Sequence, residues 1–242
     1  MKSPVTVSPP VAGGKIAFGS RRDFLRAAAV GGAAVAIPSL LTGCKIGETS
    51  LGTAGPTGPL LTIDFSSGDT AYLKFLSVYK QIQADLYVRM VAGLSTSDFT
   101  VAEQALVTEI KNHEIIHRDT IAAVLGTINA VSPTPKWGTT NFKKAADILV
   151  LAYKFEDISV GLVNGMLQHL TSSANIQFAL EIQSVEARHS AALRDDLLPK
   201  NGSPTGFSPG TSDAAYALSG VAAVLQPLIV EALQFTNAPA GL

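Results

Sequence analysis

The chain has 242 residues, of which 18 are Lys or Arg and 19 are Asp or Glu, so its formal net charge is −1. This length suits one domain of ordinary size with a tail, and it is long enough to bury a hydrophobic core. A composition that is 47% hydrophobic and only 15% charged is typical of a folded chain. The near-neutral charge, with no basic run after residue 26, argues against nucleic-acid binding. A single cysteine excludes an internal disulfide framework and any multi-cysteine metal site.

The N-terminal segment has the features of an export signal. Residues 20–26 read SRRDFLR and resemble the twin-arginine signal, with Arg26 in place of the usual Lys. An uncharged stretch rich in Ala and Gly follows up to residue 43. It is short for a membrane span, which needs ~20 apolar residues. A charged start followed by an apolar stretch is typical of a removable signal, so we expect residues 1–43 to direct export by the twin-arginine route.

The end of this segment predicts a lipid anchor. Residues 41–44 read LTGC and resemble a bacterial lipobox, which implies cleavage before Cys44 and lipid attachment to it. The alternative is a signal cut elsewhere, which leaves Cys44 as an incidental thiol. Residues 44–69 are rich in Gly, Thr, Ser and Pro and predict a flexible tether. The expected product is a membrane-anchored lipoprotein that faces the periplasm or the cell exterior.

The rest of the chain predicts helices. Apolar residues at spacings of three and four indicate four amphipathic helices, at residues 70–94, 97–126, 142–170 and 174–198. Residues 132–138 form a longer connection, suited to crossing a bundle. A further helix is expected over residues 212–235, with a break at Pro227. Because alternating strand patterns are absent, we predict an all-α fold with a four-helix bundle at 70–200 and a C-terminal loop and Pro-kinked helix at 201–242.

Charged residues interrupt the apolar faces of three of these helices. Glu114 and His117 form one Glu-x-x-His motif, and Glu186 and His189 form a second one 72 residues later. Residues three apart lie on the same helix face, and here that face is otherwise apolar. Glu156 lies on the helix between them. Burying carboxylates costs several kcal/mol per ion unless a cation compensates, and two metal ions would do so.

This arrangement is the ligand pattern of ferritin-like carboxylate proteins. Residues 112–117, 155–157 and 185–189 resemble the bacterial ferritin-like domain family of exported proteins, over about residues 70–200. The resemblance implies a ferritin-like bundle with a long crossover between its second and third helices. It also implies a centre of iron or manganese, with two ions when complete, that reacts with peroxide or dioxygen or oxidises ferrous iron. The ligands implied are Glu114, His117, Glu156, Glu186 and His189.

The first helix departs from the family pattern. The family has a Glu there, seven residues before an aromatic residue and 33 to 35 before the Glu of the second helix. Counting back from Tyr87 or from Glu114 leads to Lys80. Gln83 is the nearest residue that offers an oxygen ligand, whereas Asp85 points mostly to another face. A cation at the ligand position favours one metal ion or none over two.

Two other residues leave alternatives open, and a third, His169, is expected to lie outside the site. Asp157 is next to Glu156 and is an alternative inward-facing carboxylate. His113 precedes His117 by one turn and is either a hydrogen-bond partner of the centre or an exposed histidine. His169 is far from the cluster in sequence and is expected to be structural.

Two functions follow from these observations. The first is an exported metalloprotein with oxidative-stress or metal-handling activity, in which case it is a non-haem di-metal oxidoreductase. The second is a metal-free ferritin-like bundle with a structural or interaction role at the cell envelope. The expected partner is the membrane, through Cys44, and not a nucleic acid. A homo-oligomer and other envelope partners stay open.

Overall fold

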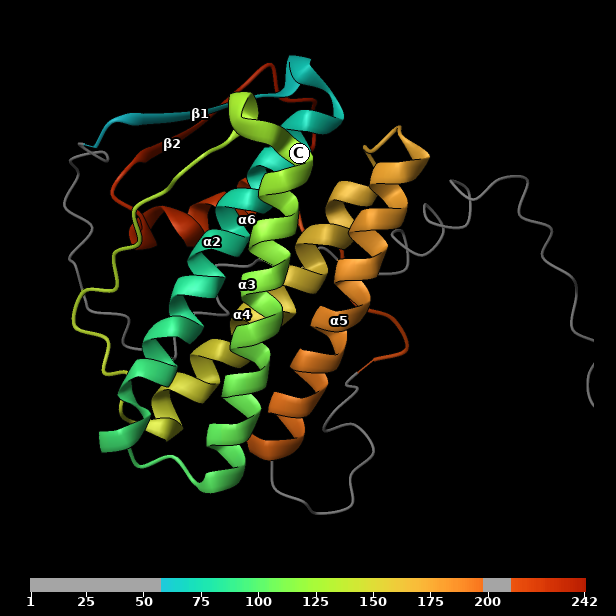
Figure 1. The fold of residues 1–242 in the computed structure, drawn as a ribbon. Helices are drawn as coiled ribbons and strands as arrows, with labels where there is room; N and C mark the ends of the chain where they lie inside the picture. Colours follow the sequence, from blue (N-terminus) through green and yellow to red (C-terminus); the bar gives the residue numbers. More distant parts are fainter. Residues whose placement is uncertain (1–57, 198–209) are drawn as a thin grey trace, which may run out of the picture.

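The computed structural model describes residues 58–197 and 210–242, and most of these residues lie in four long helices (Figure 1). The four helices are α2 (Asp69–Gly93), α3 (Val101–Asn129), α4 (Ala145–Leu167) and α5 (Ser173–Leu197). After α3, residues 130–144 run back along the bundle before α4 begins, so that α3 and α4 point the same way (Figure 1). The predicted four-helix bundle with a long crossover between its second and third helices is confirmed.

The start of α3 lies later than predicted. The sequence predicted a start at residue 97, whereas the helix begins at Val101, because Thr100 is the N-cap and forms a capping box with Glu103. The Thr100 hydroxyl accepts the Glu103 amide at 3.2 Å, and the Glu103 carboxylate accepts the Thr100 amide at 2.6 Å. Asp98 instead accepts the backbone N–H of Ala145 at 2.6 Å, and so stabilises the first turn of α4. At the other end Gly126 leaves the helical conformation, with φ of 68°, where the sequence predicted the helix to stop.

Two short strands correct the expectation that strands are absent. Strand β1 (Leu60–Asp64) pairs in parallel with β2 (Ala232–Thr236), in the register Leu60 to Ala232 through Asp64 to Thr236. The expectation of a flexible tether up to residue 69 is therefore wrong for residues 60–69, while residues 44–57 lie outside the described part. The side chains of β1 do alternate between exposed and buried. Five residues are too few to establish this pattern from sequence, and the partner strand is 172 residues away.

The C-terminal region also differs from the single kinked helix expected over residues 212–235. Helix α6 (Leu218–Leu225) is followed by the one-turn 3-10 helix η4 (Gln226–Leu228) and then by β2. The predicted break at Pro227 is confirmed, because this residue lies in η4 directly after α6. Beyond it the chain continues as an extended strand rather than as a helix.

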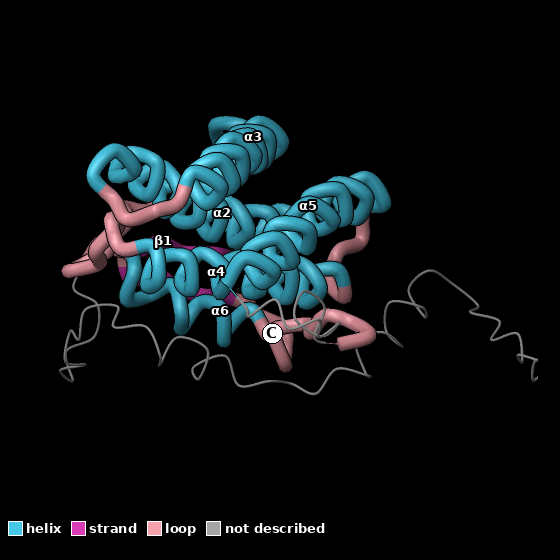
Figure 2. Tube along the Cα trace, turned by 90° about the horizontal axis from the view of Figure 1, so that it is seen from below, coloured by secondary structure: helices cyan, strands magenta, loops and turns pink. Residues whose placement is uncertain are grey.

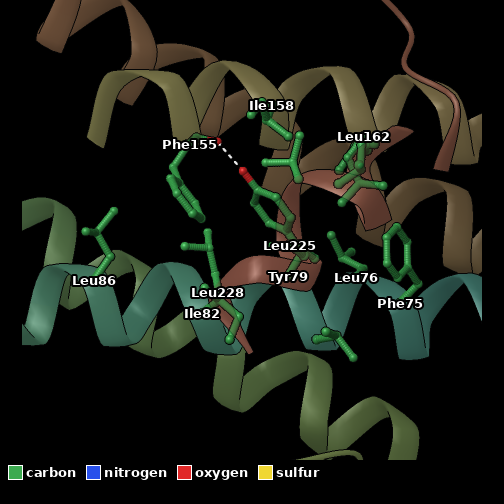
Figure 3. Close-up of a cluster of buried hydrophobic side chains, with 14 of the residues drawn as sticks. Phe75, Leu76, Tyr79, Ile82, Leu86, Phe155, Ile158, Leu162, Leu225 and Leu228 are labelled. Atoms are coloured by element: carbon green, nitrogen blue, oxygen red, sulfur yellow. Dashed lines mark hydrogen bonds between the residues drawn. The ribbon is translucent and has the colours of Figure 1, made fainter. Parts of the chain in front are cut away.

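The C-terminal segment covers the side of the bundle formed by α2 and α4. Figure 2 shows α6 beside α4, on the side away from α3. Leu225 and Leu228 are completely buried there. They join a cluster that includes Phe75, Leu76, Tyr79, Ile82 and Leu86 of α2 and Phe155, Ile158 and Leu162 of α4 (Figure 3). The apolar core is therefore concentrated on this side of the molecule.

Two glycines of α4 allow the C-terminal segment to approach closely. The Gly161 carbonyl accepts the backbone N–H of Tyr216 at 2.8 Å. A Cβ on Gly165 would lie 2.1 Å from the Tyr216 carbonyl oxygen, whereas a Cβ on Gly161 would meet only the Tyr216 ring. The backbone contact at Gly165 leaves no room for any other residue.

We predict that Gly165→Ala destabilises the protein by about 1–3 kcal/mol, because the added methyl group overpacks a backbone contact. Urea unfolding followed by circular dichroism measures this change. Gly93→Ala is the matched control, since its Cβ would meet its nearest atom at an ordinary 3.5 Å. Equal stability of the two variants would contradict the close approach at Gly165.

Candidate metal centre

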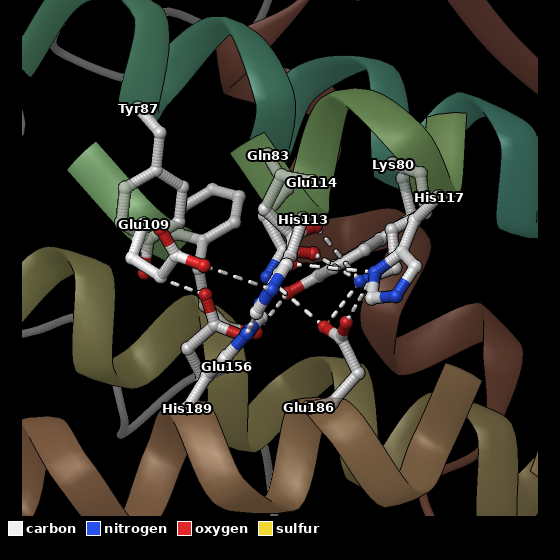
Figure 4. A network of polar contacts seen from close by, with 12 residues as sticks. Lys80, Gln83, Tyr87, Glu109, His113, Glu114, His117, Glu156, Glu186 and His189 are labelled. Carbon is white, nitrogen blue, oxygen red and sulfur yellow. Dashed lines mark hydrogen bonds and ion pairs between the residues drawn. The ribbon is translucent and has the colours of Figure 1, made fainter. Parts of the chain in front are cut away.

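A cluster of charged side chains lies between the four long helices (Figure 4). Its members are Lys80 from α2, Glu114 and His117 from α3, Glu156 from α4, and Glu186 and His189 from α5. The three glutamates and the lysine are completely buried, and the two imidazoles are 8% and 6% exposed. The structure thus brings together all five predicted ligands and the lysine that replaces the sixth.

Lys80 contacts the glutamates of both Glu-x-x-His motifs. Its Nζ donates to Oε2 of Glu114 at 3.0 Å, forms an ion pair with Oε2 of Glu186, and donates to Oε1 of Gln83 at 2.9 Å. The Gln83 amide in turn donates to Oε2 of Glu186 at 3.2 Å. Burial by itself would lower the pKa of Lys80, but Glu114 and Glu186 outweigh it and hold the pKa above its usual value. The amine is therefore a buried, charged ammonium.

The opposite end of the cluster resembles a metal site. One ligand atom from each of Glu114, Glu156, Glu186 and His189 lies within 4.8 Å of the others. His189 Nδ1 is 3.3 Å from Oε1 of Glu114 and 3.4 Å from Oε2 of Glu156. The other oxygen of Glu156 accepts the Tyr87 hydroxyl at 2.5 Å. This hydrogen bond fixes the orientation of Glu156 and leaves its Oε2 directed at the cluster.

His117 stands outside this group of four. Its Nδ1 lies 2.8 Å from Oε1 of Glu186 and 3.5 Å from Oε1 of Glu114. Figure 4 shows His117 beside Lys80, whereas His189 lies beside Glu156. Both imidazoles therefore face Oε1 of Glu114, but only His189 also faces Glu156 and only His117 also faces Glu186.

Five buried atoms of the cluster make no hydrogen bond. They are Oε1 of Glu114, Nδ1 of His117, Oε2 of Glu156, Oε1 of Glu186 and Nδ1 of His189. Buried polar atoms are almost always hydrogen-bonded, so five orphans in one place need an explanation. These atoms lie close together without the alignment of a hydrogen bond, as expected of ligands directed at a shared cation. The donor set of carboxylate oxygens and imidazole nitrogens therefore fits a divalent metal ion.

The charges of the cluster shift its acid–base properties strongly. Burial, together with Glu186 and Glu114, raises the pKa of Glu156 to about 8. Burial by itself would lower the pKa of His189, but its contacts with Glu114 and Glu156 outweigh burial and raise this pKa to about 10. Both shifts reflect an excess of buried negative charge, which in the absence of a metal ion is offset by protons and by Lys80.

His113 belongs to the cluster, which resolves the alternative that the sequence left open. Its Nδ1 is 2.9 Å from Nε2 of His189, and the two rings are stacked. On its other side, Nε2 of His113 lies 3.4 Å from the exposed carboxylate of Glu109. The sequence signal for His113 is its position one turn before His117, which does not reveal that it contacts α5. His169, by contrast, stacks on Tyr72 away from the cluster, as predicted.

A pocket of about 280 Å³ borders the imidazoles of His117 and His189. It is lined by His113, Ile116, His117, Val185, Arg188 and His189, all from α3 and α5. The carboxylates themselves are completely buried behind it. The pocket therefore lies on the α3–α5 side of the cluster.

The other acidic residues considered from the sequence have structural roles. Asp157 binds the Ser190 hydroxyl and the Arg194 guanidinium, so Glu156 is the carboxylate of α4 that lies in the cluster. Asp85 accepts the indole N–H of Trp137 at 2.6 Å and thereby attaches the crossover to α2. Neither residue contributes to the cluster.

Comparison with known proteins supports two parts of the sequence interpretation. A family model for the twin-arginine translocation pathway signal matches residues 20–38, so the chain carries a signal for export across the membrane. No curated protein and no solved structure matches the chain. Within the described residues, every helix is too short or too polar to span a membrane.

A second family model, the ferritin-like domain, matches residues 68–198. This range contains the four long helices and every residue of the charged cluster. The four-helix architecture and the crossover agree with that match. The chain therefore belongs to the ferritin-like domain family.

Proposed function

We propose that this exported ferritin-like protein binds iron or manganese through Glu114, Glu156, Glu186 and His189. The observation that carries the proposal is the group of buried, converging ligand atoms without hydrogen bonds. Three carboxylates and one imidazole suit iron(II) or manganese(II), and the absence of a thiolate argues against copper(I) and structural zinc.

A bound iron or manganese ion supplies one-electron redox chemistry toward peroxide, dioxygen or another metal ion. The chain's own residues hold and orient the ligands, and Tyr87 fixes Glu156 through its hydroxyl. The pocket between α3 and α5 has a volume of about 280 Å³ and is lined in part by His117 and His189, and a pocket of this size suits small reactants. An oxidative-stress or metal-handling role therefore fits better than action on a large organic substrate.

A metal-free bundle with a structural role at the envelope is the second candidate. The contacts of Lys80 favour it, because a buried ammonium already neutralises part of the carboxylate charge. Lys80 forms no ion pair with Glu156, however, and the Lys80 contacts leave the orphaned atoms of Glu114 and Glu186 without hydrogen bonds. The unsatisfied end of the cluster is the reason to prefer the metal-binding function.

We predict that Glu114→Ala and His189→Ala each lower the metal content of the protein strongly, because each removes a ligand from the group of four. Elemental analysis of mature protein, exported by its own host, measures iron and manganese per chain. His169→Ala is the control, since it also removes a partly buried imidazole but lies outside the cluster. Metal-free wild-type protein, even after incubation with ferrous and manganous ions, would refute the proposed function.

We also predict that His113→Ala weakens metal binding about 10–100-fold without changing the number of bound ions, because hydrogen-bond partners orient metal-ligating histidines. Titration calorimetry with Mn²⁺ measures this affinity. His113→Asn, whose amide retains hydrogen-bonding capacity, should recover part of the loss. An unchanged affinity in His113→Ala would show that its contact with His189 has no part in binding.

We further propose that a lipid on Cys44 anchors the exported protein to a membrane. The twin-arginine signal and the lipobox-like residues 41–44 support this proposal. We predict that Cys44→Ala moves the protein from the membrane to the soluble envelope fraction, whereas Ser50→Ala leaves it in the membrane. Cell fractionation with immunoblotting measures the distribution, and a membrane-bound Cys44→Ala protein would contradict the anchor.

A further inference from the structure

The two ends of the charged cluster offer two positions for positive charge. At one end Lys80 Nζ contacts Oε2 of both Glu114 and Glu186. The Oε1 atoms of the same two carboxylates make no hydrogen bond and are available to a second cation. Glu156 and His189 stand only at this second end (Figure 4). Glu114 and Glu186 therefore connect two cation positions, of which Lys80 fills one.

The charge of the cluster agrees with this division. A family site with four glutamates carries a charge of −4, which two divalent ions neutralise. In this chain three glutamates and one ammonium carry a charge of −2, which one divalent ion neutralises. A second divalent ion would leave an excess of +2 in a buried site, at a large electrostatic cost. Lys in place of Glu thus raises the charge of the site by two units, which equals the charge of one divalent ion.

Packing keeps the ammonium in place. Lys80 is completely buried, and its amine has three partners in Glu114, Glu186 and Gln83. If the side chain swung away, it would have to leave these partners and place its charge in the apolar core that surrounds α2. A metal ion therefore cannot displace Lys80 at low cost.

We propose that the Lys80 ammonium permanently occupies one of the two cation positions, so that the centre has room for one divalent metal ion and not for two. The remaining position is formed by Glu114, Glu156, Glu186 and His189. His117 borders this position, because its Nδ1 faces Oε1 of both Glu186 and Glu114. This inference rests on the proposed metal-binding function and specifies its stoichiometry.

The test is to load folded protein with Mn²⁺ under anaerobic conditions, remove excess metal, and measure manganese per chain by elemental analysis. Electron paramagnetic resonance of the same samples distinguishes an isolated Mn²⁺ ion from an exchange-coupled pair. We expect one ion per chain and the six-line spectrum of an isolated ion in wild-type protein. We expect Lys80→Glu, which restores the fourth carboxylate, to bind two ions and give a coupled spectrum.

Lys74→Glu is the matched control, because it makes the same charge change on α2 outside the cluster, and it should bind one ion. Two ions in wild-type protein, or one ion in folded Lys80→Glu, would overturn the inference. If Lys80→Glu fails to fold, the wild-type count and spectrum decide, since an isolated ion supports the inference and a coupled pair refutes it. Wild-type protein without metal would refute the proposed function but not the role of Lys80. In that case Lys80→Glu tests this role: bound metal in the variant would support it, and a metal-free variant would refute it.

Discussion

Three carboxylates buried between four helices are the constraint on which the rest of this structure depends. Burying an unpaired charge costs several kcal/mol of folding free energy, so Glu114, Glu156 and Glu186 require positive charges close to them in the protein interior. Lys80 supplies one positive charge, and the raised pKa of His189 shows that the cluster also attracts protons. The fold satisfies this requirement by directing one face of each long helix at a common point.

The apolar core and the pocket beside the charged cluster lie on different sides of the bundle. The C-terminal segment covers α2 and α4, where Leu225 and Leu228 complete the apolar core, and close contacts at α4 glycines fix it in place. Among the described residues no segment covers the α3–α5 side, and the pocket beside His117 and His189 lies there. Because the cluster side chains project from rigid helices and not from loops, opening one side to solvent does not disturb their positions.

The sequence was most informative where periodicity and spacing act locally. The four helices, and the shared face of Glu and His in each Glu-x-x-His motif, follow from i, i+3 and i, i+4 patterns along single helices. The convergence of the five predicted ligands was implied by the resemblance to the ferritin-like family. The errors concern non-local contacts. Strand β2 forms only because β1 lies beside it, and helical periodicity over residues 212–235 gave no sign of that partner. Similarly, nothing near His113 in the sequence indicates that it stacks on His189 of another helix.

Lys80 illustrates how one residue can change the chemistry that a fold supports. A pair of metal ions sharing two carboxylates can exchange two electrons with one peroxide or dioxygen molecule, whereas a single iron or manganese ion between its divalent and trivalent states exchanges one. The same helices and the same Glu-x-x-His motifs are compatible with either kind of centre, because fold does not determine function. In this chain the Lys80 ammonium lies against Glu114 and Glu186, and under our proposal it takes the electrostatic place of one metal ion. Because an ammonium cannot change its oxidation state, the proposed chemistry of this centre depends on the residue at position 80 as well as on the bundle that carries it.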